Sequence, residues 1–259
     1  MEMTVRGARI HYELTGQGTK RVVLLHGWGC SGQLMRCVAA GLEGDMRVLS
    51  LDFPGHGESG RPPEPWGVPE FAGALLELLR ALDFLPCSVV AHSFGGRVAI
   101  WLASEDSGLF EKLVLTGAAG IRKPQTEEGR KRSEEYKRLR GLAENARKLK
   151  LFGSLPDKWE DSLRKKYGSA DYNALDEEMR KTFVKVINLD LADRLPRIQQ
   201  PTLLLWGDQD TETPLWMGQQ MERDIPDAGL VVLQGGTHFA WAEQSARFNT
   251  ITHHFLTED

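Results

Sequence analysis

The stretch Ser88-Val89-Val90-Ala91-His92-Ser93-Phe94-Gly95-Gly96 decides how this chain is interpreted. A short apolar run leads directly into Ser93, small residues flank it, and a helical pattern follows at once. Such a turn from strand to helix is strained and exposes the serine hydroxyl where a base can reach it. A serine that merely caps a helix produces a similar pattern. The choice between the two therefore depends on the rest of the chain.

The overall composition is that of an ordinary globular protein. The 259 residues include 41% hydrophobic and 26% charged side chains, which suits one large α/β domain or a domain with an insertion. The formal net charge of −4 argues against a nucleic-acid partner. No apolar stretch approaches the roughly 20 residues of a membrane span, and the chain begins without a secretory signal pattern.

The cysteines indicate a reducing compartment. The chain has an odd number of cysteines without the spacing of metal ligands: Cys30, Cys37 and Cys87. This pattern suits free thiols in the cytoplasm. We therefore expect a cytoplasmic monomer or homodimer that acts on a small molecule and has no metal site.

Apolar runs and amphipathic segments alternate along the chain. A hairpin is predicted around Gly7, and buried strands are predicted at Arg21–Leu25, Arg47–Asp52, the run entering Ser93, Lys112–Thr116, Pro201–Trp206 and Gly229–Leu233. Helical spacing occurs over Phe71–Leu82 and Arg97–Ser104. This alternation predicts an open, mostly parallel sheet with helices on both faces. His26, Asp52, Ser93 and Asp210 all fall at the carboxyl ends of strands, where such sheets place their chemistry.

The alternation stops over residues 121–194. This stretch is helical in pattern over Glu127–Leu151, Asp157–Tyr167 and Ala174–Asn188. Residues 122–194 contain 19 Lys and Arg against 14 Asp and Glu, a net of +5, which leaves −9 for the remainder. Solvated helix faces explain this charge, and a basic lining that attracts an acidic substrate is the alternative. We expect a core domain of residues 1–120 and 195–259 and a helical cap of residues 121–194.

A serine nucleophile needs a base, and the base needs a partner that holds its tautomer. The candidate base is His238, which lies in a glycine-flanked junction after the last predicted strand. His253 and His254 lie within the final helical pattern and have the character of surface residues.

The candidate acid is Asp210, in the loop that follows another strand and precedes a helix opened by Pro214. Asp208 suits a turn better, and Glu212 suits a capping or first-turn position. The chain order of serine, aspartate and histidine is that of the α/β-hydrolase arrangement.

Two backbone N–H groups are candidates for an oxyanion hole. Phe94 follows the nucleophile at a helix N-terminus, and Trp28 lies in the glycine-rich turn His26-Gly27-Trp28-Gly29. Glycines in that turn allow close approach of the main chain to a substrate. An ordinary strand-to-helix turn is the alternative, and His26 suits a hydrogen-bonding brace better than a catalytic role.

Together these residues resemble the α/β-hydrolase superfamily, and within it the capped members that need no cofactor. The likeness is carried by His26-Gly27-Trp28-Gly29, Asp52-Phe53-Pro54-Gly55-His56-Gly57-Glu58-Ser59, Ala91-His92-Ser93-Phe94-Gly95-Gly96, the Trp206–Pro214 loop and Gly236-Thr237-His238-Phe239. The resemblance implies Ser93 as nucleophile, Asp210 as acid and His238 as base, with Trp28 and Phe94 as backbone donors. It also implies a structural role for Asp52–Ser59. Ala91 departs from the commoner glycine.

The resemblance implies a serine hydrolase that cleaves a small-to-medium carboxylic ester through an acyl-enzyme. The first alternative is a carbon–carbon bond hydrolase of a diketone-type ring-fission product, and the second is a slow-turnover receptor. Ser93 argues against relatives that use an aspartate at this turn, the haloalkane dehalogenases and epoxide hydrolases. Trp28 and Trp241 are the candidate substrate contacts. The cap aromatics Trp159, Tyr136, Tyr167, Tyr172 and Phe183 either line an acyl pocket or form the core of the cap.

Overall fold

The computed structural model describes residues 1–124, 126–148, 155–167 and 170–258. It divides into two units, Met1–Ile121 with Val184–Asp259, and Arg122–Phe183. Residues 184–194, which the sequence pattern assigns to the cap, thus group with the larger unit. The reason is packing, since Val186 and Leu191 are buried in the main core.

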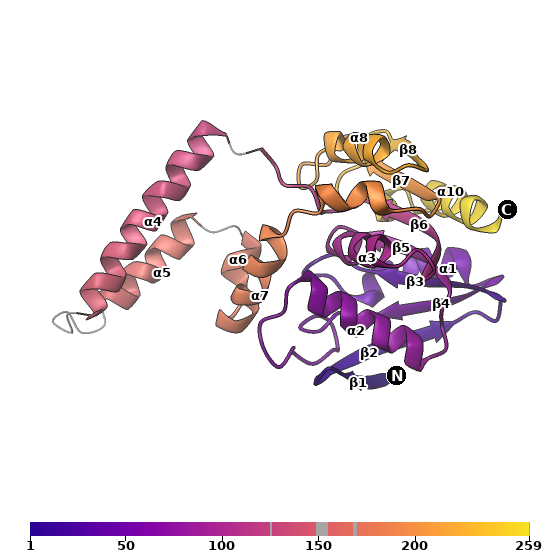
Figure 1. The fold of residues 1–259 in the computed structure, drawn as a ribbon, viewed down its shortest axis with the longest axis horizontal. Coiled ribbons are helices and arrows are strands. Elements are labelled where there is room, and N and C mark those ends of the chain that lie inside the picture. Colours follow the sequence, from indigo (N-terminus) through magenta and orange to yellow (C-terminus); the bar gives the residue numbers. More distant parts are fainter. Residues whose placement is uncertain (125, 149–154, 168–169, 259) are drawn as a thin grey trace. The chain divides into compact units, whose positions relative to one another are not determined.

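Over the described residues, eight strands form one sheet in the larger unit (Figure 1). They are β1 (Glu2–Val5), β2 (Ala8–Thr15), β3 (Lys20–Leu25), β4 (Met46–Leu51), β5 (Cys87–His92), β6 (Phe110–Thr116), β7 (Thr202–Gly207) and β8 (Ala228–Leu233). Their order is β1-β2-β4-β3-β5-β6-β7-β8, antiparallel at β1–β2 and β2–β4 and parallel elsewhere. The predicted hairpin and mostly parallel sheet are confirmed.

The order of the strands determines where a site can form. The chain continues from β3 to β4 on one side, while β5 pairs with β3 on the other. This reversal is the switch point at which the loops after neighbouring strands diverge and leave a crevice. Leu25 at the end of β3 is in register with Ala91 near the end of β5. The loop containing Trp28 and the turn containing Ser93 therefore leave the sheet side by side.

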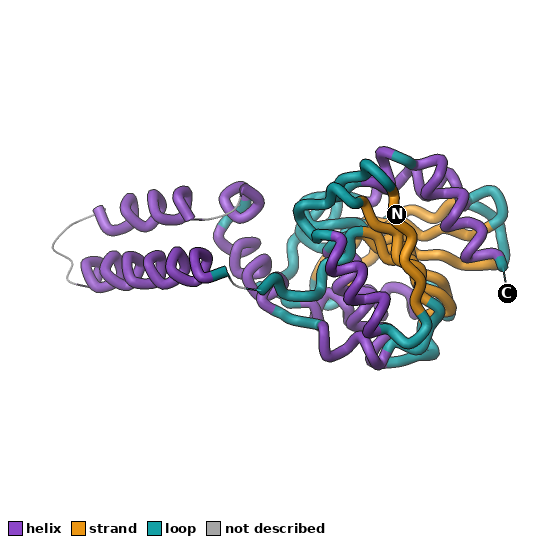
Figure 2. The backbone as a smooth tube through the Cα atoms, turned by 90° about the horizontal axis from the view of Figure 1, so that it is seen from above, coloured by secondary structure: helices purple, strands orange, loops and turns teal. Residues whose placement is uncertain are grey.

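Helices cover both faces of the sheet, as Figure 2 shows. In the larger unit they are α1 (Arg36–Leu42), α2 (Val68–Ala81), α3 (Phe94–Glu105), α8 (Leu215–Asp224), α9 (Ala240–Glu243) and α10 (Ser245–Thr257). One hydrophobic cluster contains the buried residues of α2, α3 and α8, and a second contains those of α1, α9 and α10. Helix α2 begins earlier than its apolar spacing indicates. Pro69 occupies its first turn, and the Glu70 carboxylate caps the Gly67 N–H.

The smaller unit is helical. It contains α4 (Glu127–Lys148), α5 (Leu155–Tyr167), α6 (Ala170–Ala174) and the start of α7 (Glu177–Asn188). Helices α4 and α5 pack together, with Ala143 and Leu163 buried between them. Buried Glu160 lies 2.6 Å from Arg147 and 3.7 Å from Arg140.

Two predicted helices of the smaller unit differ from the structure. The predicted extension of the first to Leu151 lies outside the described residues. The helix predicted over Ala174–Asn188 begins later, at Glu177, because the Asp176 carboxylate accepts the N–H groups of Glu178 and Met179 and so starts α7 there, while Ala174 ends the separate helix α6. Over the described ranges, no helix has both the length and the hydropathy that crossing a bilayer requires.

Candidate active site

Ser93 lies between β5 and α3 with φ 50° and ψ −108°, a conformation that non-glycine residues rarely adopt. The small neighbours make this turn possible. A Cβ atom at Gly95 would lie 2.4 Å from the Leu25 carbonyl oxygen, and one at Gly96 would lie 2.5 Å from the Ala118 Cβ. The predicted strained turn from strand to helix is thus present.

Main-chain hydrogen bonds hold this turn in place. The Ser93 N–H donates to the Thr116 carbonyl at 3.2 Å, and its carbonyl accepts the N–H groups of Gly96 and Ala119, each at 3.0 Å. Phe94 carries the first N–H of α3, a position without an intrahelical acceptor. The backbone around Ser93 is therefore fixed by both the sheet and the helix.

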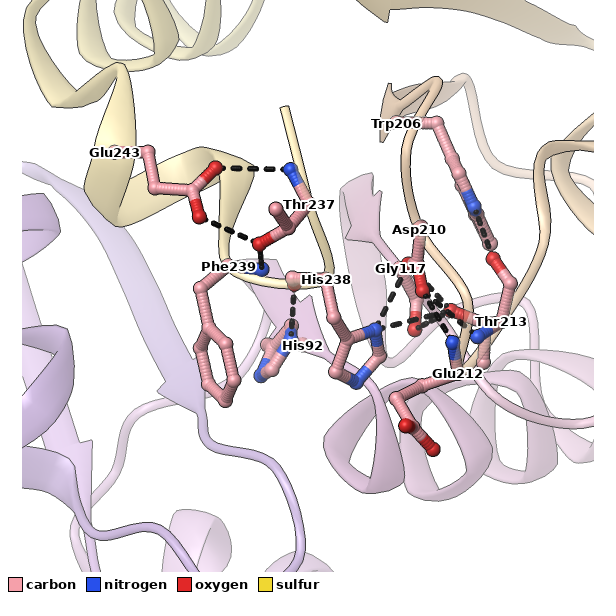
Figure 3. Close-up of polar contacts among 10 residues, drawn as sticks. All are labelled: His92, Gly117, Trp206, Asp210, Glu212, Thr213, Thr237, His238, Phe239 and Glu243. Carbon is pink, nitrogen blue, oxygen red and sulfur yellow. Dashed lines mark hydrogen bonds and ion pairs between the residues drawn. The ribbon is translucent and has the colours of Figure 1, made fainter. Parts of the chain in front are cut away.

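Asp210 and His238 form a pair at the ends of β7 and β8 (Figure 3). The His238 Nδ1 lies 2.8 Å from Asp210 Oδ2, and the side chain of Asp210 is almost fully buried. Asp210 Oδ1 accepts the N–H groups of Glu212 and Thr213, each at 2.9 Å. Because Nδ1 faces the carboxylate, Nε2 lies on the opposite side of the imidazole ring.

The electrostatics of this pair favour an ionised Asp210. Burial pushes the pKa of Asp210 upward, but the hydrogen bond and charge of His238 and the hydrogen bonds from Thr213 outweigh it. The net effect is a pKa below the ordinary value for aspartate. At neutral pH the carboxylate can therefore hold the proton of the imidazole on Nδ1.

The two competing acids lie elsewhere. Asp208 Oδ1 accepts the Gly235 N–H at 2.6 Å and so links the loops after β7 and β8. This contact agrees with the turn role predicted for Asp208. Glu212 is exposed and precedes α8 without entering its first turn, so the predicted capping role is not present. Of the three carboxylates, Asp210 is the one that contacts His238.

The sheet brings Ser93 and this pair to the same place. The Ser93 N–H bonds to Thr116, and a Cβ atom on the next residue, Gly117, would lie 3.1 Å from both Asp210 Oδ2 and His238 Nδ1. In the described residues no hydrogen bond joins Ser93 Oγ to His238. Catalytic hydrogen bonds are often long without substrate and tighten when it binds.

His92, which precedes Ser93, also joins the two parts of the site. Its Nε2–H donates to the His238 carbonyl at 2.9 Å, and the two rings lie 4.6 Å apart. Burial lowers the pKa of His92 to about 3, so the ring is neutral at physiological pH. The sequence pattern did not identify His92 as a contact of the predicted base, His238, because the two residues are far apart in the chain.

The loop after β3 is braced from behind. The Phe53 N–H donates to His26 Nε2 at 2.9 Å, and His26 Nδ1–H donates to the Gly27 carbonyl at 2.7 Å. Burial lowers the pKa of His26 to about 3, which keeps the ring neutral and this pattern intact. His26 therefore has the bracing contacts that the sequence indicates. The Trp28 ring packs edge-on against Phe94, with the centroids 5.3 Å apart.

The Asp52–Ser59 segment has the structural contacts expected of it. Asp52 is buried and its carboxylate accepts the N–H groups of Gly32 at 2.7 Å and Glu58 at 2.8 Å. The Ser59 hydroxyl donates to the Asp52 carbonyl at 2.6 Å. These bonds shape the loop beside the predicted donor Trp28.

Trp241 does not have the surroundings expected of a substrate contact. Its side chain is 0% exposed and belongs to the core on the α1 and α10 face. Because none of it is accessible, the structure offers a substrate no contact with Trp241. Phe239 is 39% exposed, and its ring lies 5.5 Å from that of His238. Phe239 is therefore a better candidate for a substrate contact than Trp241. The sequence pattern did not identify it as one, although its position directly after the predicted base could have indicated it.

The comparisons agree with this architecture. The profile of the Alpha/beta hydrolase family matches residues 22–251, and the chain belongs to that family. It is similar to a 2-hydroxy-6-oxononadienedioate/2-hydroxy-6-oxononatrienedioate hydrolase of Cupriavidus pinatubonensis, with 28% identity over 96% of this chain and 90% of that protein. It is 27% identical to a pimeloyl-(acyl-carrier protein) methyl ester esterase of Nitrosospira multiformis, over 92% of this chain and 95% of that protein.

Among solved structures, the chain is similar to the enol-lactonase of Burkholderia xenovorans LB400. The TM-score is 0.76 at 22% sequence identity, and all of both chains is covered. This likeness shows the fold. The match of the family profile over residues 22–251 confirms the predicted membership of the α/β-hydrolase superfamily.

Proposed function

We propose that this protein is a serine hydrolase that cleaves a small-to-medium carboxylic ester through an acyl-enzyme. Ser93 is the nucleophile, His238 the general base and Asp210 the acid that orients it. The observation that carries the proposal is the 2.8 Å contact of buried Asp210 with His238, at the sheet edge where Ser93 lies in its strained turn. This arrangement supplies the three parts that acyl transfer by a serine needs.

The reaction follows from the roles of these groups. Ser93 Oγ attacks the ester carbonyl while His238 Nε2 takes its proton, and the N–H groups of Trp28 and Phe94 stabilise the oxyanion. His238 returns the proton to the departing alcohol as the acyl-enzyme forms. A water molecule, deprotonated by His238, then attacks the acyl group. His238 returns that proton to Ser93 Oγ as the bond to the acyl group breaks, which releases the acid and free Ser93. Asp210 stays ionised throughout and stabilises the imidazolium.

Carbon–carbon bond hydrolysis is the second candidate, and a relative favours it. The relative of Cupriavidus pinatubonensis is named for substrates with a 2-hydroxy and a 6-oxo group, whereas that of Nitrosospira multiformis is named as a methyl ester esterase. Ester hydrolysis and carbon–carbon bond hydrolysis would use the same triad, but proton transfer is the central step of carbon–carbon bond hydrolysis. A higher kcat/KM for a diketone than for simple esters would select it.

We further propose that the helical insertion, predicted at residues 121–194, is a cap that selects the substrate. The rings of Tyr136 and Tyr167 lie in tilted contact with their centroids 5.5 Å apart, which supports a role in the core of the cap, while Trp159 is 38% exposed. Trp28 beside Phe94 is the stronger candidate for a contact with substrate. A slow-turnover receptor remains the third hypothesis, and turnover measurements distinguish it.

The experiment is fluorophosphonate labelling of the wild type and Ser93→Ala, followed by a p-nitrophenyl ester series of increasing acyl length and a diketone. We expect labelling at Ser93 and a loss of turnover on the order of 10⁴ to 10⁶ in the variant. Wild-type turnover by folded Ser93→Ala would contradict the mechanism. Labelling without ester turnover would favour the diketone reaction or the receptor.

A further inference from the structure

The side chain of Thr213 lies at the centre of the acid–base pair. It is buried, and its Oγ1 is 2.8 Å from Asp210 Oδ2, 2.9 Å from the Gly117 carbonyl and 3.2 Å from His238 Nδ1 (Figure 3). Its main-chain N–H donates to Asp210 Oδ1 at 2.9 Å. Thr213 thus contacts both oxygens of the acid, the base and the loop after β6.

A count of protons and lone pairs shows what this hydroxyl contributes. When the Thr213 hydroxyl points to Oδ2, Asp210 accepts four hydrogen bonds, from the main chain of Glu212 and Thr213 on Oδ1 and from His238 and the Thr213 hydroxyl on Oδ2. A carboxylate has about four acceptor sites, so all are filled and the group cannot rotate freely. The single hydroxyl proton has two acceptors, Asp210 Oδ2 and the Gly117 carbonyl, and is satisfied in either direction.

We propose that Thr213 is a positioning residue that holds the Asp210 carboxylate toward His238. Its hydroxyl also gives or withdraws one hydrogen bond to that carboxylate as His238 changes its protonation state. This inference rests on the proposed function of the triad. With neutral His238, the hydroxyl donates to Asp210 Oδ2. When His238 has taken the Ser93 proton, the hydroxyl turns to the Gly117 carbonyl and leaves Oδ2 to the imidazolium. No heavy atom moves, which is the preorganisation that electrostatic catalysis requires.

Few other titratable groups face this pair. His92 lies against His238 from β5 and is kept neutral by burial, which lowers its pKa to about 3. On the loop after β7, Asp208 is engaged by the Gly235 N–H and Glu212 is exposed. Glu243 from α9 bonds to the hydroxyl and N–H of Thr237. A change in the pH profile of Thr213 variants would therefore originate in Asp210 and His238.

The test compares Thr213→Val, which removes the hydroxyl at nearly constant shape, with Thr213→Ser, which retains it. The readout is the second-order rate of fluorophosphonate labelling from about pH 5 to about pH 9, because labelling requires activated Ser93 but no known substrate. We expect Thr213→Val to be slower by about tenfold or more and Thr213→Ser to stay within about threefold of wild type.

The pH profile separates positioning from packing. In the wild type the hydroxyl stabilises the neutral state of the pair by donating to Asp210 Oδ2, so its loss shifts the balance toward the imidazolium state. The acid limb of the Thr213→Val profile should therefore move to higher pH, whereas that of Thr213→Ser should not.

Thr252→Val is the matched control. Thr252 in α10 is buried, and its hydroxyl makes no hydrogen bond within the described residues. Its variant should label at the wild-type rate. Melting temperatures of all variants report folding, and Thr213→Ala replaces Thr213→Val if the latter does not fold.

The outcomes distinguish this inference from the proposed function. Wild-type labelling of Thr213→Val, with Ser93→Ala unlabelled, would overturn the role of Thr213 alone. Equal slowing of the Val and Ser variants with an unmoved acid limb would also overturn it, since packing would then explain the effect. Labelling of Ser93→Ala at the wild-type rate would overturn the triad itself.

Discussion

Individual carboxylates in the loop after β7 have different tasks although they lie close together in the chain. Asp208 and Asp210 are separated by one residue, yet the first accepts the Gly235 N–H and the second contacts His238. Between them the chain turns, with the Asp210 N–H donating to the Gly207 carbonyl at 3.4 Å and the Gln209 N–H to the Gly236 carbonyl at 2.9 Å, so the two side chains reach different partners. Residue type alone therefore does not distinguish a turn aspartate from a triad acid.

Substitution of each aspartate by asparagine should separate these roles. We expect Asp210→Asn to lower kcat by about 10⁴, because the amide cannot hold the correct tautomer of His238. Asp208→Asn should stay within about threefold of wild type, because its amide oxygen can still accept the Gly235 N–H. Steady-state kinetics with the best ester measures both. A larger loss in Asp208→Asn would identify Asp208 as the acid.

At the level of elements, the junction of β5 with α3 shows that close packing, rather than local preference, maintains the strained turn. The first residues of α3 lie directly against the end of β3, where the Gly95 N–H donates to the His26 carbonyl at 3.1 Å. This contact sets the height of the helix N-terminus above the sheet. It therefore also sets the position of the Phe94 N–H.

Gly95→Ala should disrupt this junction. The added Cβ would lie 2.4 Å from the Leu25 carbonyl oxygen, so α3 or β3 must shift. We expect a loss of about 1–3 kcal/mol in the free energy of unfolding and slower labelling of Ser93. Denaturant unfolding gives the first quantity.

Gly141→Ala is the control, because Gly141 lies inside α4 with nothing within 4 Å of the added Cβ. There the same substitution should stabilise the helix by about 0.5–1 kcal/mol. Equal effects at the two positions would contradict a steric origin for the effect at Gly95.

For the molecule as a whole, two buried neutral histidines link the candidate active site to stability against acid. His26 braces the loop after β3, and His92 ties β5 to the loop of His238. Burial is the first cause of the low pKa of each, about 3. The unfolded chain instead binds these protons near pH 6.5. Below that pH, protons favour the unfolded state.

The free energy of unfolding should therefore fall as the pH drops from about 6.5 toward 3, by about 1.4 kcal/mol per pH unit for each of the two histidines. The lowered pKa of Asp210 acts in the same direction at more acidic pH. Urea unfolding at several pH values measures the slope. His92→Gln should remove the share of the slope that belongs to His92, about 1.4 kcal/mol per pH unit, and leave that of His26 and of His56, whose pKa is also lowered by burial. An unchanged slope would show that His92 does not contribute.

The class of fold could be predicted from the sequence because it depends on the local spacing of apolar and small residues. Buried parallel strands require near-continuous apolar runs such as Arg21–Leu25, and the strained turn requires small residues beside Ser93. The candidate residues Ser93, Asp210 and His238 could be named for the same reason, since each follows a strand in a recognisable loop. Their roles remain proposals that the variants above test.

Only the tertiary structure decided which side chains meet. Thr213 contacts both Asp210 and His238, His92 contacts His238, and Trp241 is buried in the core. The sequence around each of these residues does not indicate which contacts it makes. The end of the helical insertion was also decided by packing, since Val186 and Leu191 are buried in the main core. Periodicity and motifs specify an element and the face it buries. Contacts between loops from different strands depend on strand order and register, which are set by the packing of the complete sheet.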